Sequence, residues 1–163
     1  AIVSEMSTQQ VRALFDTSAL LLGQIVQRMA EVWRAHEADN IQQLLNQLHD
    51  ETRQGHTEKF YDLIFQGLAR QHDLISNSYL IKFYHDLLPA LRRSYFLTLN
   101  ISRRELDESF ALFKLVTDAI LNRKAQQATL FMDDFCRHLR NLVLESLTRM
   151  KQIELAWARR SRR

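Results

Sequence analysis

Apolar side chains recur along the whole chain at intervals of three and four residues. This spacing places them on one face of an α-helix, and no useful stretch shows the alternation that a half-buried strand requires. In chain order, six such faces consist of Val11, Leu14, Phe15, Leu22, Ile25, Val26, Met29, Val32 and Trp33; Ile41, Leu44, Leu45 and Leu48; Tyr61, Ile64, Phe65 and Leu68; Leu80, Phe83, Tyr84, Leu87, Leu91 and Tyr95; Leu106, Phe110, Phe113, Val116 and Ile120; and Ala128, Met132, Phe135, Leu139, Leu142, Val143, Leu147, Met150 and Ile153.

Residues that begin or end helices lie between these segments. Gly55 is placed where a left-handed C-terminal cap is expected. Thr57 is a candidate cap for the third helix, and the segment 76–78 (Ser-Asn-Ser) predicts a turn and a cap before the fourth. The segment 102–105 (Ser-Arg-Arg-Glu) has the pattern of a capping box and opens the fifth helix. Pro89 falls inside the fourth pattern, where it should kink or split the helix.

The composition agrees with an all-α protein. Among 163 residues there are only three glycines and one proline, fewer than hairpins and βα turns need. Hydrophobic residues make up 46% and charged residues 25%, the balance of a globular protein. We therefore expect residues 1–163 to form one domain, a single antiparallel bundle of about six helices. If the last helix is continuous to Trp157, its length is roughly 50 Å.

Other features of the chain bear on its location. No apolar run is long enough to cross a membrane, and no secretory signal opens the sequence. The single cysteine, Cys136, excludes an internal disulfide framework and suits a reducing compartment. These features predict a cytoplasmic protein with no membrane partner.

The net charge of +3 is unevenly distributed, because four arginines crowd the last five residues: Arg159, Arg160, Arg162 and Arg163. Such a tail could contact nucleic acid. The favoured interpretation is a solvated helix end whose cations complement the negative pole of the helix dipole.

The sequence shows no catalytic constellation. It has no glycine-rich phosphate loop, no Cys-x-x-Cys pair, no His-Glu-x-x-His motif and no nucleophile elbow. Cys136 lies on or beside the apolar face of the last helix and is expected to be a buried, inert thiol. The six histidines are dispersed, with no two at the i, i+4 spacing of a helical metal site. We expect the protein not to be an enzyme.

Two polar pairs are candidates for binding chemistry. Arg12 and Asp16 lie four residues apart on the first helix, and Asp62 and Gln66 lie four apart on the third, next to apolar Phe65. They are either exposed pairs of small energetic value or inward-facing groups. A buried arginine would need a paired or bound anion.

Several of these segments occur in the order and spacing of a known family. The runs Val11–Asp16, Asp62–Gln66, Ile75–Leu80, Leu112–Ile120 and Met132–Phe135 together resemble the C-terminal effector domain of the FadR subfamily of GntR-type regulators. The resemblance covers nearly the whole chain. It implies a ligand-sensing helical domain, with a winged helix-turn-helix domain that would precede it and for which this chain has no room.

The departures from the family pattern concern a metal site. Many members hold a metal ion with the motif's Asp, here Asp62, and three histidines, at positions that here carry Gln66, Phe113 and Phe135. An amide and two phenyl rings cannot replace imidazole nitrogens, so we expect no metal and no cofactor. The same loss resembles the acyl-CoA-responsive branch of the subfamily.

The resulting hypothesis is a regulator domain that binds a small organic effector, a long-chain acyl-CoA or another fatty acid derivative. Its predicted ligand-binding residues are Arg12, Asp62, Gln66, Phe113 and Phe135, with Arg12 supplying the positive charge. The resemblance also implies a homodimer that contacts DNA only through the separate N-terminal domain. Two alternatives remain open: a metal-free sensor of a small carboxylate, and a helical interaction module with a solid core.

Overall fold

The computed structural model describes residues 6–71 and 73–162. These residues form six α-helices and no strand, which confirms the predicted all-α class. In chain order the helices are α1 (Thr8–Val32), α2 (Ala35–Gln54), α3 (Thr57–Ala69), α4 (Ser78–Phe96), α5 (Arg103–Leu121) and α6 (Ala125–Ser161).

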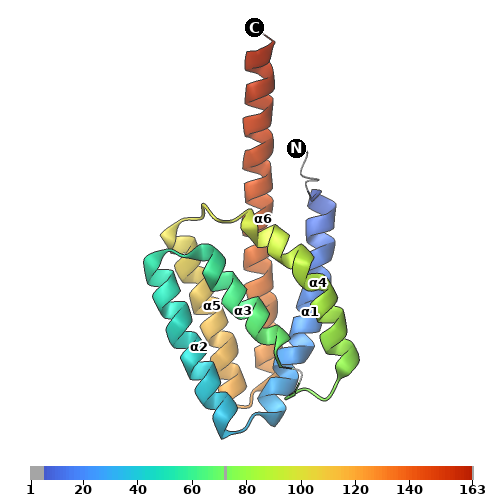
Figure 1. Cartoon of the computed structure of the whole chain (residues 1–163), viewed down its shortest axis with the longest axis vertical. Coiled ribbons are helices and arrows are strands. Elements are labelled where there is room, and N and C mark those ends of the chain that lie inside the picture. The colour runs from blue at the N-terminus through green and yellow to red at the C-terminus, as the bar shows by residue number, and fades with distance from the viewer. Residues whose placement is uncertain (1–5, 72, 163) are drawn as a thin grey trace.

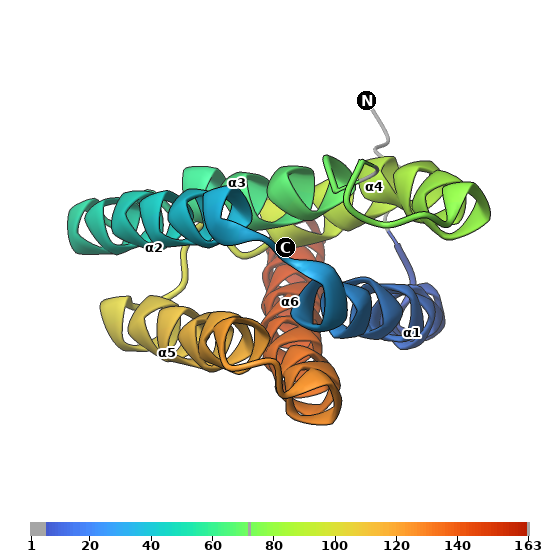
Figure 2. The ribbon, with the colours of Figure 1, turned by 90° about the horizontal axis from the view of Figure 1, so that it is seen from below.

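The helices run alternately up and down the bundle in two layers. Figure 1 shows that each helix reverses the direction of the one before it, with α3 and α4 inclined to the others. Seen from below, α2, α3 and α4 form one layer, and α1, α6 and α5 form the other (Figure 2). Helix α6 lies between α1 and α5 and contacts both extensively.

Helices α1 and α6 approach closely at Gly23. The hydroxyl of Thr129 on α6 donates a hydrogen bond to the Gly23 carbonyl at 3.1 Å. A Cβ atom at position 23 would stand only 3.2 Å from the Thr129 methyl carbon. A residue without a side chain is therefore what allows these two helices to pack at this distance.

The helix ends match most of the sequence predictions. Ser102 and Glu105 form the predicted capping box, and Asn77 accepts a hydrogen bond from the backbone of Leu80 at 3.0 Å. Gly55 ends α2 in the left-handed region, with φ +72°. The prediction for Thr57 is wrong, because His56 occupies the N-cap and Thr57 is already the first helical residue.

Helix α4 rules out one of the two outcomes predicted at Pro89, and it differs from its predicted pattern at Phe83. It continues through Pro89, so the proline does not split it. Phe83 was assigned to the inner face but is 55% exposed, whereas Ile81 is buried. The buried face of α4 centres on Tyr84 and Leu91. Because each residue turns the helix by about 100°, Ile81 lies closer to the centre of this face than Phe83 does.

Helix α6 extends far beyond the rest of the bundle, as Figure 1 shows. Its 37 residues give a length of about 55 Å, and it passes Trp157 without interruption. Residues 151–162, the last part of α6 and the residue that follows it, are all exposed; we call this segment the arm. No helix among the described residues is long and apolar enough to span a bilayer.

Candidate functional site

The interior contains an aromatic cluster at the positions where the family pattern would place a metal. Phe113 on α5 and Phe135 on α6 pack edge to face, with their ring centres 5.4 Å apart. Phe65 on α3 contacts Phe135 at 6.1 Å and stacks on Tyr95 at 5.5 Å. Phe113 and Phe135 are 2% and 0% exposed, so their rings fill this part of the core.

Asp62 is engaged by groups from α4. The hydroxyl of Tyr95 donates a short hydrogen bond to its Oδ1, and Nε of Arg92 lies 3.4 Å from the same oxygen. Arg92 also reaches the carboxylate of Glu58 at 3.7 Å. Burial, reinforced by the hydrogen bond to Asp62, raises the pKa of Tyr95 well above its usual value, so this phenol stays protonated as a donor.

The described residues contain no group of three or more His, Cys, Asp or Glu side chains placed to hold a metal ion. At the positions where the resemblance implies metal ligands, Asp62 is engaged by the Tyr95 phenol and the Arg92 guanidinium. The rings of Phe113 and Phe135 offer no lone pair. The donor set therefore does not fit a transition metal.

The remaining predicted site residues lie apart from this cluster. Arg12 and Asp16 are exposed on the outer side of α1, because Val11, Leu14 and Phe15 define its inner face. Of the two interpretations of the pair Arg12 and Asp16, the structure therefore shows the exposed one. Gln66 and Asp62 instead border a small hollow of about 260 Å³ between α2 and α3, with Glu51, Lys59, Leu63 and Arg70.

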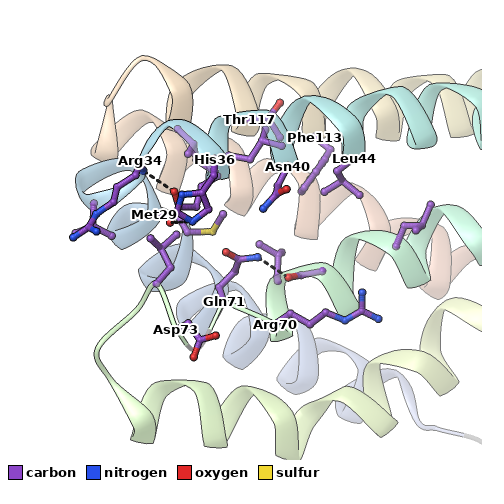
Figure 3. A pocket seen from close by; sticks show the side chains of 18 of the residues that line it. Met29, Arg34, His36, Asn40, Leu44, Arg70, Gln71, Asp73, Phe113 and Thr117 are labelled. Carbon is purple, nitrogen blue, oxygen red and sulfur yellow. Dashed lines mark hydrogen bonds and ion pairs between the residues drawn. The ribbon is translucent and has the colours of Figure 1, made fainter.

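A larger pocket of about 810 Å³ lies between the end of α1, the first half of α2, the end of α3 and the second half of α5 (Figure 3). Of the five predicted residues, only Phe113 lines it. Its other lining residues are Met29, Val32, Arg34, His36, Glu37, Asn40, Ile41, Leu44, Gln47, Leu63, Gly67, Leu68, Arg70, Gln71, Asp73, Leu74, Ser76, Thr117 and Ile120.

Buried and exposed residues contribute to different parts of this lining. Phe113, Thr117, Ile120 and Leu68 are each at most 4% exposed, and they supply an almost wholly apolar base. The polar and charged lining residues of α2 and of the segment after α3 are mainly exposed and form the rim. The pocket thus offers an apolar interior and a polar opening.

Some polar and charged side chains at the rim have hydrogen-bond or ion-pair partners among the described residues, and others do not. The Glu37 carboxylate accepts a hydrogen bond from the Arg34 backbone at 2.9 Å and lies 3.0 Å from Nε2 of His36. The side chain of Gln71 donates to the Gly67 carbonyl at 3.0 Å. Within the described part of the chain, the guanidinium of Arg70 has neither a hydrogen bond nor an ion pair, and Arg70 lines both hollows. Arg70 is therefore the cation best placed to meet an incoming anion.

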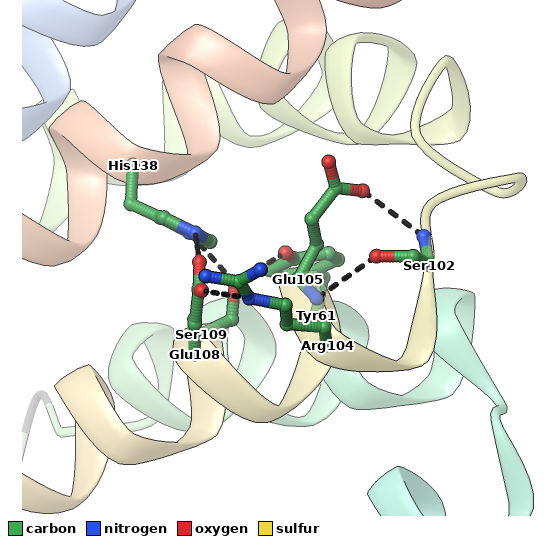
Figure 4. A network of polar contacts seen from close by, with 7 residues as sticks. All are labelled: Tyr61, Ser102, Arg104, Glu105, Glu108, Ser109 and His138. Carbon is green, nitrogen blue, oxygen red and sulfur yellow. Dashed lines mark hydrogen bonds and ion pairs between the residues drawn. The ribbon is translucent and has the colours of Figure 1, made fainter.

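A chain of polar groups links the core to the surface beside the aromatic cluster (Figure 4). Tyr61 and Ser109 share a hydrogen bond of 2.8 Å, Ser109 lies 3.0 Å from Nδ1 of His138, and His138 lies 3.4 Å from Glu108. Burial raises the pKa of Tyr61 far above its usual value. The hydroxyl of Ser109, three residues after Leu106 on the apolar face of α5, was the available sequence signal for this network.

The pocket could not be predicted from the sequence, because Arg70 and most of the rim residues belong to no motif. They come from a helix start, a helix end and a connecting segment. Only the packing of four helices brings them together, so no periodicity along the chain marks them.

Comparison with known proteins identifies the fold. A family model, the FCD domain, matches residues 13–141, about four fifths of the chain. No curated protein matches the chain. FCD domains are regulatory domains of transcription factors and not an enzyme family. The chain therefore belongs to the FCD domain family, the ligand-sensing C-terminal domains of GntR-type transcription regulators.

Proposed function

We propose that this domain senses an amphiphilic organic anion, a long-chain acyl-CoA or a related fatty acid derivative, in the 810 Å³ pocket. The observation that supports this proposal is the division of that pocket into an apolar base and a polar rim that includes Arg34 and Arg70. Its volume falls within the range of about 300–1,000 Å³ that is usual for small-molecule sites.

The apolar base would hold the acyl chain. Leu68, Phe113 and Ile120 come from α3 and α5 and present no polar atom to a ligand. Each methylene group that leaves water for such a surface contributes about 0.8 kcal/mol. Affinity should therefore increase with chain length until the base of the pocket is filled.

Arg70 replaces Arg12 as the proposed anion-binding residue. Arg12 is exposed on α1 and lines neither hollow, whereas Arg70 lies where the two hollows adjoin. A guanidinium can donate two parallel hydrogen bonds to a carboxylate or phosphate. In this arrangement Gln66 and Asp62, which line the smaller hollow, would contact the polar end of the effector rather than its acyl chain.

Effector binding in this pocket would act on the packing of the helices. The lining comes from α1, α2, α3 and α5, so a ligand that fits one arrangement of these helices better than another shifts the equilibrium between them. A DNA-binding domain joined to this one would respond to that shift.

Titration calorimetry with octanoyl-, dodecanoyl- and hexadecanoyl-CoA tests the proposal. We expect affinity to increase along the series. Arg70→Gln should weaken binding by about tenfold, the effect of losing one charge-assisted hydrogen bond. The matched control is Arg93→Gln, because Arg93 is exposed and lines neither hollow.

Absence of binding by every thioester would contradict the acyl ligand. Binding of short carboxylates alone, with no dependence on chain length, would favour the metal-free sensor of a small carboxylate. If no organic anion bound, the domain would be an interaction module.

We further propose that the domain works without a bound metal. Asp62 is already engaged by Tyr95 and Arg92, and two phenyl rings occupy former ligand positions. Metal analysis of protein dialysed without chelator should find far less than one zinc, nickel or manganese ion per chain. One tightly held ion per chain that disappears in the Asp62→Ala variant would contradict this.

A further inference from the structure

The arm is a regular helix that adds nothing to the core of the bundle. Residues 151–162 are all exposed, and α6 remains helical to Ser161. The FCD family model ends at residue 141, so the arm lies beyond the matched domain. Over 12 residues it projects about 18 Å from the bundle.

Charge is concentrated at this end of the chain. Residues 149–163 contain six Lys or Arg residues and one Glu, a net charge of +5, while the whole chain carries +3. The first 148 residues therefore carry a net charge of −2. Residues 149–163, which contain the arm, are thus a basic extension of a mildly acidic bundle.

The cations of the arm include a set on one face. Lys151, Arg159 and Arg162 are separated by eight and three residues, spacings that bring side chains to the same side of a helix. Leu155 lies between them on this side, four residues from Lys151 and four from Arg159. The apolar side chains of Ile153 and Trp157 point to a different side. We call the set Lys151, Arg159 and Arg162 the basic face.

We propose that the basic face contacts the phosphate backbone of duplex DNA. Its first and last cations are 11 residues apart, about 16 Å along the helix, and duplex DNA presents a phosphate charge about every 1.7 Å along its axis. Helix α1 begins at the end of the bundle from which the arm projects (Figure 1), so a DNA-binding domain joined before α1 would lie on the same side.

Charge also favours DNA over a second copy of this chain as the partner of the basic face. Two basic faces would repel each other, whereas a polyanion attracts both. The proposal revises the expectation that DNA is contacted only through a separate domain. It does not depend on the identity of the effector.

Fluorescence anisotropy with a labelled 30-base-pair duplex of arbitrary sequence tests the proposal on the 163-residue chain. We expect weak binding at about 50 mM salt that falls steeply as salt increases. The triple variant Lys151→Gln, Arg159→Gln, Arg162→Gln should bind at least tenfold more weakly. The slope of log affinity against log salt should decrease by about 3, one unit for each phosphate contact.

The matched control is the triple variant Lys82→Gln, Arg93→Gln, Lys114→Gln, which removes three exposed cations from the bundle itself. It should bind the duplex almost as the unaltered chain does. If both triple variants lost the same affinity for the duplex, the binding would depend only on net charge, and the proposal would be overturned. Binding to phosphatidylglycerol vesicles but not to the duplex would also overturn it, in favour of an anionic membrane surface. Circular dichroism of both variants should show unchanged helicity.

Discussion

At the scale of single residues, the buried polar groups are the most informative feature of this bundle. Tyr61 is fully buried, and its hydroxyl depends on Ser109 for a hydrogen bond. A buried polar group without a partner costs more than the hydrogen bond itself contributes, because its desolvation is no longer offset. The network therefore fixes which side chains of α3, α5 and α6 can face one another.

The first prediction concerns Ser109→Ala. This variant should lower the free energy of unfolding by about 1–3 kcal/mol, because it removes the partner of the Tyr61 hydroxyl. The double variant Tyr61→Phe, Ser109→Ala should cost less than the sum of the two single changes. Urea denaturation measures both. Thr148→Ala serves as the control, since its exposed hydroxyl bonds only to its own helix at Leu144; equal losses for Ser109→Ala and this control would contradict the prediction.

The second prediction concerns the thiol of Cys136, which was expected to be buried and is 1% exposed. Burial raises its pKa from 9.0 to about 12, and Asp133 adds to the effect. The folded state thus holds the neutral thiol, while the unfolded state releases the proton above pH 9. Stability should therefore decrease as pH increases from about 9 towards 12, by up to about 1.4 kcal/mol per pH unit from this group.

The Cys136→Ala variant isolates most of this contribution, because burial, the main cause of the raised pKa of Tyr61, Tyr84 and Tyr95, is present in both proteins. Its stability should decline less steeply with pH than that of the unaltered chain. Parallel curves for the two proteins between pH 9 and 11 would show that the thiol does not contribute.

At the scale of helices, the connections are held by specific contacts. The Arg123 guanidinium stacks on the Trp33 ring at 4.2 Å and donates to the Trp33 carbonyl at 2.8 Å. The indole of Trp33 donates in turn to the Ile120 carbonyl at 2.8 Å. The turn between α5 and α6 is thereby fastened to the end of α1, next to the proposed effector pocket.

Gly55 and Gly67 allow a comparison between a glycine with a left-handed backbone and a glycine inside a helix. Gly55→Ala should destabilise the protein by about 1–2 kcal/mol, because φ is +72° there and a Cβ atom is disfavoured in the left-handed region. Gly67→Ala should stabilise it by up to about 1 kcal/mol, since this residue is inside α3 and its Cβ would meet only Leu44 at 3.9 Å. Thermal unfolding measures both; equal shifts in the same direction would contradict the assignment of Gly55 as a cap.

At the scale of the whole molecule, exposed apolar side chains remain after the bundle has formed. Leu20 is 74% exposed, whereas Leu21 and Leu144 are half-buried against the core. Leu130 on α6 is 65% exposed and follows Thr129, which contacts α1 at Gly23. Leu20 and Leu130 thus lie on adjoining helices near that contact.

We predict that the chain forms a two-fold dimer that buries this apolar surface. Sedimentation at tens of micromolar protein should show an average mass above that of the monomer. The double variant Leu20→Glu, Leu130→Glu should shift the equilibrium towards monomer. Its control, Leu155→Glu, removes an equally exposed leucine from the arm. A purely monomeric unaltered chain would contradict the prediction.

The sequence alone determined the class of fold and most helix ends. Helical periodicity and local capping depend on residues within one or two turns of each other, so Gly55, Asn77 and Ser102 could be assigned without tertiary information. Phe83 could not be assigned in this way, because the direction of the buried stripe on α4 is set by the helices against which it packs.

Only the tertiary structure decided the arrangement of the candidate site. The resemblance predicted Asp62, Phe113 and Phe135 as site residues, but it could not show that the two phenyl rings pack edge to face in the core or that Tyr95 and Arg92 engage the aspartate. The pocket near Arg70 is formed by four helices whose lining residues are far apart in the sequence. A cavity is a property of the packing between elements, and local patterns along the chain carry no information about the space that this packing leaves.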